Sequence, residues 1–71
     1  MSARRFKIIV NGFAETVDEP TSLEKIVEAH GDGDLHAIVE KNGRYVYPQE
    51  YATVIVEPGD EIEIVHPDFG G

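Results

Sequence analysis

Residues 61–65 read EIEIV, and they run directly into the tail HPDFGG at residues 66–71. Charged and apolar side chains alternate in the first segment, and successive side chains of a β-strand point to opposite faces of a sheet. Ile62 and Ile64 are therefore predicted on a buried face, and Glu61, Glu63 and Val65 on a solvated one. We expect residues 66–71 to form a flexible tail, because glycine lacks the Cβ that restricts other residues.

Two further parts of the sequence carry turn signals: the segment directly before this strand, and the first hairpin of the chain. Glu57–Asp60 reads EPGD, with Pro and Gly at the two central positions that a type II turn prefers. Phe6–Val10 is equally β-prone and is closed by Asn11-Gly12, a dipeptide typical of a tight hairpin whose second strand is Phe13–Val17. Placed side by side in the middle of a mixed sheet, the first and last strands would both be buried.

A single main helix is predicted after the first hairpin. Asp18-Glu19-Pro20 ends the strand, and Thr21 with Glu24 three residues later forms a capping-box pattern. The apolar stripe of this helix is Leu23, Ile26, Val27 and His30. Gly31 is expected to end the helix.

The middle of the sequence predicts a second hairpin. Ala37–Glu40 is a buried-type strand, Asn42-Gly43 is a turn, and Tyr45–Tyr47 is a short strand that Pro48 terminates. Residues 49–56 fit either a short helical turn or an extended crossover. The predicted fold is α+β: a β-grasp, or ubiquitin-like, mixed sheet of four to five strands with one main helix packed across it. Residues 1–71 form a single predicted domain.

Composition limits the classes of function. The 71 residues hold six Lys and Arg against fourteen Asp and Glu, a formal charge of −8. Such a charge repels phosphate backbones and anionic lipid, so neither nucleic acid nor a membrane is an expected partner, whereas a basic protein groove is. Cysteine is absent, and Phe6–Val10 is too short and too interrupted for a signal segment, so we expect a cytoplasmic protein.

Metal binding and catalysis by the chain itself are not expected. Asp32 and Asp34 lie near glycines, but the further oxygen ligands and the closing Glu of a calcium loop are missing. The spacing of His30, His36 and His66 predicts no metal site. A domain this short has little room for an enclosed catalytic cavity beside its core.

The tail is the candidate site. Gly70 and Gly71 can lie in a slot too narrow for side chains, and six extended residues span about 20 Å. The terminal carboxylate, ionised at neutral pH, could attack the α-phosphorus of ATP in a partner's active site to give an acyl adenylate. Gly71 is therefore the expected site of adenylation. The residues expected to bind the partner are Gly70, Phe69, Asp68, Pro67, His66 and Val65.

The chain resembles the ThiS family, the ubiquitin-like sulfur carriers of thiamine biosynthesis. The resemblance rests on Ile38–Gly43, Val46–Tyr51, Pro58–His66 and the final Gly70-Gly71. The small subunit of molybdopterin synthase, MoaD, is similar in fold and tail but less so in these motifs. The intervening Pro67-Asp68-Phe69 departs from the usual apolar tail of the family, which leaves the sulfur-accepting enzyme open.

The resemblance implies a protein co-substrate rather than an enzyme. A ubiquitin-activating-like adenylyltransferase would use ATP and magnesium to adenylate Gly71, and no cofactor would stay bound to the carrier, which is expected to be a monomer when free. Sulfur from a persulfide donor would convert the adenylate to a thiocarboxylate for a sulfur-accepting synthase, first of all thiazole synthase. The alternatives are sulfur transfer to molybdopterin or an amino acid, a ubiquitin-like protein modifier, and a plain β-grasp interaction module.

Overall fold

The computed structural model describes residues 4–30, 33–34 and 36–67 of the chain. Its elements are β1 (Arg5–Val10), β2 (Phe13–Asp18), α1 (Leu23–His30), β3 (Ile38–Lys41), β4 (Arg44–Val46), a 3-10 helix (Pro48–Glu50) and β5 (Glu61–Val65). The five strands form one sheet in the order β2-β1-β5-β3-β4. β1 and β5 are parallel, and the other neighbouring strands are antiparallel.

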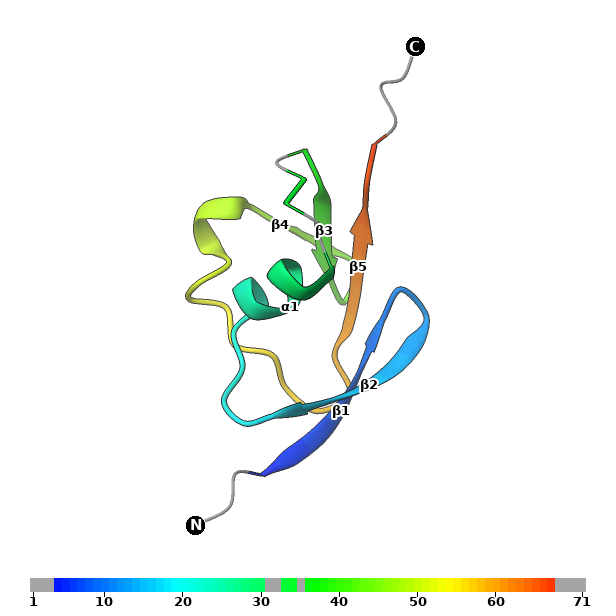
Figure 1. The fold of residues 1–71 in the computed structure, drawn as a ribbon, viewed down its shortest axis with the longest axis vertical. Coiled ribbons are helices and arrows are strands. Elements are labelled where there is room, and N and C mark those ends of the chain that lie inside the picture. Colours follow the sequence, from blue (N-terminus) through cyan, green and yellow to red (C-terminus); the bar gives the residue numbers. More distant parts are fainter. Residues whose placement is uncertain (1–3, 31–32, 35, 68–71) are drawn as a thin grey trace.

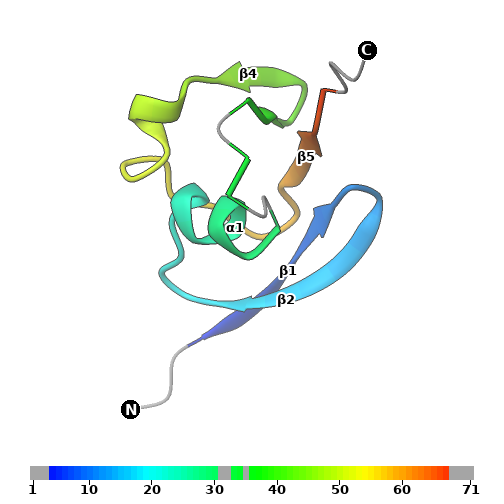
Figure 2. The same cartoon turned by 45° about the horizontal axis from the view of Figure 1, so that its top comes forward.

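The helix α1 lies across one face of this sheet, which curls around it (Figures 1 and 2). The first and last strands are neighbours at the centre, as the sequence predicts. This is the β-grasp arrangement, so the predicted fold class is confirmed, with five strands in the described part of the chain.

The core lies between α1 and the inner face of the sheet. Its members are apolar side chains no more than 7% exposed, contributed by every layer: Ile8, Val10, Leu23, Ile26, Val39, Val46, Val56, Ile62 and Ile64. The predicted alternation of β5 is confirmed, because Ile62 and Ile64 are buried while Glu61, Glu63 and Val65 are exposed. The face that carries Ile62 and Ile64 and packs against α1 is the inner face of the sheet. The face that carries Glu61, Glu63 and Val65 is the outer face.

The helix begins one residue later than its capping-box pattern predicts. Ser22 Oγ accepts the N–H of Lys25 at 3.4 Å and so occupies the N-cap position. Thr21 is buried instead, and its hydroxyl donates to the carbonyl of Asp18. The carbonyl of Thr21 also accepts the N–H of Val56 at 2.9 Å. These contacts hold Thr21 against the crossing connection, which leaves Ser22 to cap the helix.

The apolar stripe of α1 is confirmed. Leu23 and Ile26 are buried, and Val27 and His30 are half-buried. The helix ends at His30, and the predicted stop residue Gly31 lies outside the described residues. His30 Nε2 lies 2.7 Å from Glu15 Oε2 on β2, so the polar end of the stripe binds a carboxylate of the sheet.

Both predicted hairpin turns are present. Asn11 and Gly12 have φ values of 51° and 86°, and Asn42 and Gly43 have 54° and 83°. Two successive positive φ values define the type I′ turn, which matches the twist of a hairpin. The two strands that flank the second turn each differ from the prediction by one residue. β3 begins one residue later, at Ile38, and β4 begins one residue earlier, at Arg44.

Residues 49–56, predicted to form either a short helical turn or an extended crossover, contain both, one after the other. Pro48–Glu50 forms a single 3-10 turn, and the chain then crosses beside the start of α1 in extended form. There Val54 accepts the N–H of Leu23 at 2.7 Å, and Ile55 pairs with Ser22. Gly59 follows with a φ of 83° in the predicted turn, which the N–H of Asp60 closes onto the carbonyl of Glu57 at 3.0 Å.

Asp60 locks the start of β5 onto the second hairpin. Asp60 is only 7% exposed. Its carboxylate accepts one hydrogen bond from Asn42 Nδ2 at 3.0 Å and another from the N–H of Glu57 at 2.8 Å. Lys41 Nζ lies 3.6 Å from the same carboxylate. The side chain of Asn42 in turn accepts the N–H of Glu61 at 2.9 Å. A carboxylate this buried contributes to stability only because its oxygens are paired.

We predict that Asp60→Ala lowers the free energy of unfolding by about 2–3 kcal/mol, because it leaves the Asn42 amide and the N–H of Glu57 without their acceptor in two part-buried hydrogen bonds. Urea unfolding followed by circular dichroism measures this change. Glu57→Ala is the control, since its exposed side chain lies in the same turn. An equal loss in both variants would contradict a specific role for the Asp60 carboxylate.

Candidate functional site

The candidate site begins where β5 ends. On one side β5 pairs with β3 along its length, up to the pair Ile38 and Val65. On the other side the β1 pairing stops at Val10 and Ile62. Asn11 continues it from the turn: its N–H donates to the carbonyl of Ile62 at 2.9 Å, and its Oδ1 accepts the N–H of Ile64 at 2.7 Å. The strand is therefore held on both sides almost to its last residue, at the end from which the chain continues toward the C-terminus (Figure 1).

His66, directly after β5, contacts the connection between α1 and β3. Its Nδ1 lies 2.9 Å from Oδ2 of Asp34. The other oxygen of Asp34 accepts the N–H of His36 at 2.8 Å. Side-chain exposure is 40% for His66 and 27% for Asp34, so solvent reaches this contact.

The electrostatics of Asp34 follow from these partners. The hydrogen bond from His66 lowers the pKa of the Asp34 carboxyl below its ordinary value of 3.8, and the hydrogen bond from the backbone of His36 lowers it further. Both donors favour the charged form of the carboxyl. At neutral pH, Asp34 therefore presents a carboxylate to the base of the tail.

Four exposed apolar or aromatic side chains lie on the outer face beside the end of β5. They are Ile38 at 40% exposure, Tyr45 at 48%, Tyr47 at 56% and Val65 at 50%. Ile38 and Val65 are directly opposite each other in register. The rings of Tyr45 and Tyr47 meet edge to face with centroids 4.7 Å apart. We call these four residues the outer apolar patch.

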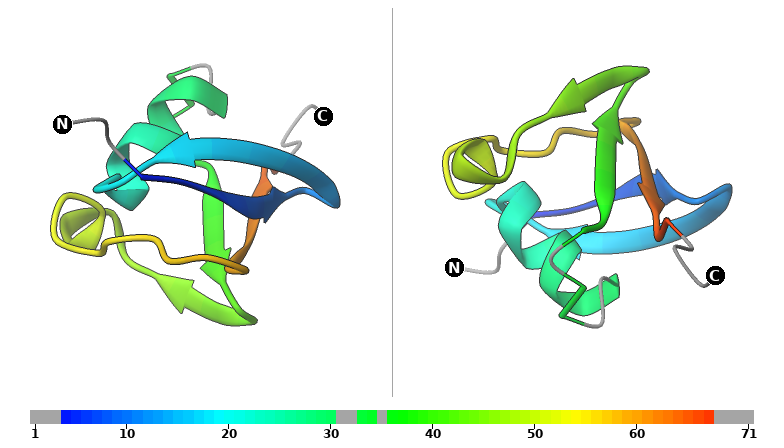
Figure 3. Two further views of the ribbon diagram at one scale, coloured as in Figure 1. Left: turned by 90° about the horizontal axis from the view of Figure 1, so that it is seen from below. Right: turned by 90° about the horizontal axis from the view of Figure 1, so that it is seen from above.

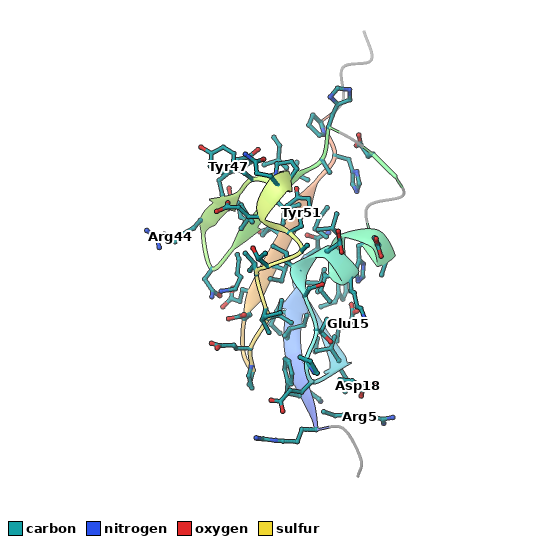
Figure 4. The ribbon with its side chains drawn as sticks, turned by 90° about the vertical axis from the view of Figure 1, so that its left-hand side faces the viewer. Arg5, Glu15, Asp18, Arg44, Tyr47 and Tyr51 are labelled. Atoms are coloured by element: carbon teal, nitrogen blue, oxygen red, sulfur yellow. The ribbon has the colours of Figure 1, made fainter. Side chains whose placement is uncertain are left out.

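Figure 4 shows where the aromatic end of this patch lies. Tyr47 projects outward near the 3-10 helix that follows β4, whereas Tyr51, after the same helix, lies closer to the body. Tyr51 is half-buried against the core, and burial raises the pKa of its hydroxyl. Tyr45 and Tyr47, by contrast, are surface residues.

Acidic side chains border the outer apolar patch. Glu40 on β3 and Glu63 on β5 are directly opposite each other, and Glu61 is exposed two residues before Glu63 on the same face. Like charges at opposite positions of two antiparallel strands destabilise a sheet. The outer face therefore combines exposed apolar surface with negative charge, a combination that suits a partner with apolar and basic groups.

The structure places three of the predicted tail residues. Val65 belongs to the outer apolar patch, His66 binds Asp34, and Pro67 is half-buried. Asp68, Phe69, Gly70 and Gly71 lie outside the described residues.

Two residues of this site were not predicted from the sequence as functional candidates. Asn11 was assigned only a turn, and the use of its side chain as an acceptor for β5 follows from the parallel pairing of β1 and β5. Asp34 was considered only as a calcium ligand and rejected as one, and its contact with His66 joins residues 32 positions apart in the chain. No local sequence pattern signals such a contact, because it depends on where β3 and β5 end.

Within residues 4–30, 33–34 and 36–67, no group of three or more His, Asp and Glu side chains is arranged to hold a metal ion. His30 and His66 contact different carboxylates, those of Glu15 and Asp34. Over the same residues, no helix has the length and apolar character needed to cross a membrane.

Comparison with known proteins matches this chain both to a family model and to a solved structure. The model of the ThiS family matches residues 4–71. The crystal structure of thiamine biosynthesis protein ThiS from Geobacter metallireducens matches with a TM-score of 0.76 and 26% identity, covering 93% of this chain and 100% of that one. A search of curated proteins found no match.

The strand order, the helix across the inner face and the structural match define a ubiquitin-like β-grasp domain. Its last strand lies at the centre of the sheet and is the one that continues into Gly70-Gly71. Because the family match covers nearly the whole sequence, the chain belongs to the ThiS family.

We predict that His66→Ala raises the pKa of Asp34 toward its ordinary value, because the larger of the two hydrogen bonds that lower it is removed. A carboxyl with a lowered folded pKa contributes stability above its unfolded pKa and loses it as pH falls through the folded value. The stabilisation from this contact should therefore vanish in acid, below 3.8. Side-chain carboxyl NMR titration measures the pKa. An unchanged value in the variant would show that His66 does not bind Asp34 in solution.

Proposed function

We propose that this protein is a sulfur carrier of thiamine biosynthesis, acting as a co-substrate of other enzymes. The observation that carries the proposal is the family match, which extends to residue 71 and so includes Gly70-Gly71. The structural neighbour from Geobacter metallireducens, named as a thiamine biosynthesis protein, supports the pathway. The body of the domain supports the role of co-substrate, since the chain has no cysteine to form a competing thiol.

The proposed reaction takes place at the α-carboxylate of Gly71. In a partner adenylyltransferase that binds ATP and magnesium, this carboxylate attacks the α-phosphorus and pyrophosphate leaves, which forms an acyl adenylate. The outer sulfur of a persulfide donor then attacks the acyl carbon and AMP leaves, which forms an acyl disulfide. A thiol reduces this disulfide, which releases the thiocarboxylate and leaves the donor sulfur in a new disulfide. A sulfur-accepting synthase, thiazole synthase in this proposal, takes the sulfur and returns the carboxylate.

Gly70 and Gly71 suit the entry of the tail into such a site. Without Cβ atoms they can pass a constriction that excludes side chains. The terminal carboxyl group needs no neighbouring base to become a nucleophile, because an α-carboxyl group with a pKa of about 3.3–3.7 is ionised at neutral pH. The carrier's contribution is to present this group at the end of a strand that is paired on both sides.

We predict that incubation with a cognate adenylyltransferase, ATP, magnesium and a persulfide sulfur source changes the intact mass by one oxygen-to-sulfur exchange. Intact-protein mass spectrometry measures this change. A variant that lacks Gly71 is the matched control and should keep its original mass, because it retains the body but its terminal carboxylate, now on Gly70, lies one residue short of the reacting position.

Two outcomes would contradict this reaction. Covalent conjugates of higher mass would indicate a ubiquitin-like modifier. Unchanged mass together with no release of pyrophosphate would show that Gly71 is not activated, and an interaction module would then be the better reading.

The outer apolar patch is the proposed docking surface for the adenylyltransferase. It lies beside the end of β5, so a partner bound there is also close to the base of the tail. Exposed aromatic and aliphatic side chains of this kind are frequent energetic centres of interfaces. Glu61 and Glu63 beside the patch would face basic groups on the partner.

We predict that Ile38→Glu raises the KM for the carrier in adenylation by about tenfold or more, because it places a charge in the apolar centre of the proposed interface. Ile55→Glu is the matched control: Ile55 is 48% exposed but lies beside the start of α1. Steady-state kinetics of pyrophosphate release measure the effect. Equal KM values for the two variants would place the docking surface elsewhere.

A further inference from the structure

The contact between Asp34 and His66 joins the base of the tail to a part of the chain that the tail reaction does not otherwise involve. Asp34 lies on the connection between α1 and β3, and His66 follows the last residue of β5. Their side chains meet at 2.9 Å. Figure 1 shows the start of β3 and the end of β5 at the same end of the molecule, and the right-hand view of Figure 3 looks down onto that end.

Asp34 is itself held in place. One carboxylate oxygen accepts the N–H of His36 at 2.8 Å, and its carbonyl accepts the N–H of Ala37 at 3.3 Å. The turn around Asp34 leads directly into β3, which pairs with β5. The carboxylate is thus a fixed acceptor, tied to the same sheet from which the tail begins.

His66 is the residue at which the direction of the tail is set. The next residue is Pro67, whose ring fixes φ and removes an N–H donor. The residue before a proline is itself restricted to extended conformations. With both residues restricted in this way, few torsions are left to vary at the tail's base, and the contact with Asp34 selects among them.

We propose that Asp34 is a positioning residue for the tail. Through its contact with His66 it fixes the direction in which the chain leaves the sheet at Pro67, so that a docked carrier presents Gly71 to the adenylation site. This inference rests on the proposed function and assigns to the domain a way of orienting its own reactive end. Asp34 acts through His66 and touches no reacting atom.

The physical basis is preorganisation. A tail that leaves the body in one direction loses less conformational freedom when it enters a partner's slot than a tail with a free base. Restricting the backbone of about one residue beforehand should change the equilibrium for entry of the tail into the slot by roughly tenfold. The outer apolar patch would bind the partner whether or not the tail is oriented, so the effect should fall on the rate after docking.

The test compares adenylation kinetics for the wild type, Asp34→Ala, His66→Ala and the double variant. Each single variant should lower kcat by about tenfold with little change in KM, and the double variant should be no slower than either one, because the two residues act as one unit. Asp34→Asn should recover part of kcat, since its amide oxygen can still accept a hydrogen bond. Glu57→Ala removes an exposed charge near the other end of β5 and should match the wild type.

A second measurement separates this inference from the proposed function. Backbone NMR order parameters at His66 in the free carrier should fall in Asp34→Ala and stay unchanged in Glu57→Ala. Unchanged order parameters, independent losses that add in the double variant, or a rise in KM alone would each overturn the inference. A wild type that is never adenylated would overturn the proposed function, and the order parameters would still decide whether Asp34 orients the base of the tail.

Discussion

The parallel pairing of β1 with β5 is the interaction on which the rest of the structure depends. It joins the two ends of the chain through Ile9 with Glu61 and Val10 with Ile62. The N–H of Ile9 donates to Asp60 at 2.9 Å and that of Asn11 to Ile62 at 2.9 Å. Closing so long a loop costs conformational entropy, which the buried side chains between the sheet and α1 must offset. Neither hairpin could supply that burial alone, because each is a two-stranded unit with one open face.

This pairing also determines how the tail is presented. As the central strand, β5 has a neighbour on both sides, and its last inward residue, Ile64, is bound by the side chain of Asn11. A partner that draws in the tail therefore pulls on a strand anchored from two directions. An edge strand would offer one ladder of hydrogen bonds and would peel more easily. This anchoring suits the proposed function, in which the domain stays folded while its end is processed.

The sequence predicted the features that local patterns encode. The Asn-Gly turns, the alternation of β5 and the apolar stripe of α1 each depend on neighbours within a few residues, and the structure contains all of them. Thr21 was assigned the wrong role because its contact with Val56 comes from a segment far along the chain. Asp34 was missed for the same reason. Contacts of this kind follow from the packing of elements, and no spacing in the sequence represents them.

The proposed docking role of the outer face would come at a cost to the stability of so small a domain. Glu40 and Glu63 stand opposite each other with no gain to the sheet, and the neighbouring Ile38 and Val65 leave apolar surface in water. Each feature costs free energy in the isolated protein, and domains of this size have little to spare. Binding to a partner surface that carries basic and apolar groups would offset both costs. The carboxylates would gain charged partners, and the apolar side chains would be removed from water. The charge acts at long range on the rate of encounter, the apolar groups act only at contact, and the orientation of the tail matters only afterwards. Under the proposed function this separation is useful, because successive enzymes would recognise the same face while competing for a tail that only one can hold at a time.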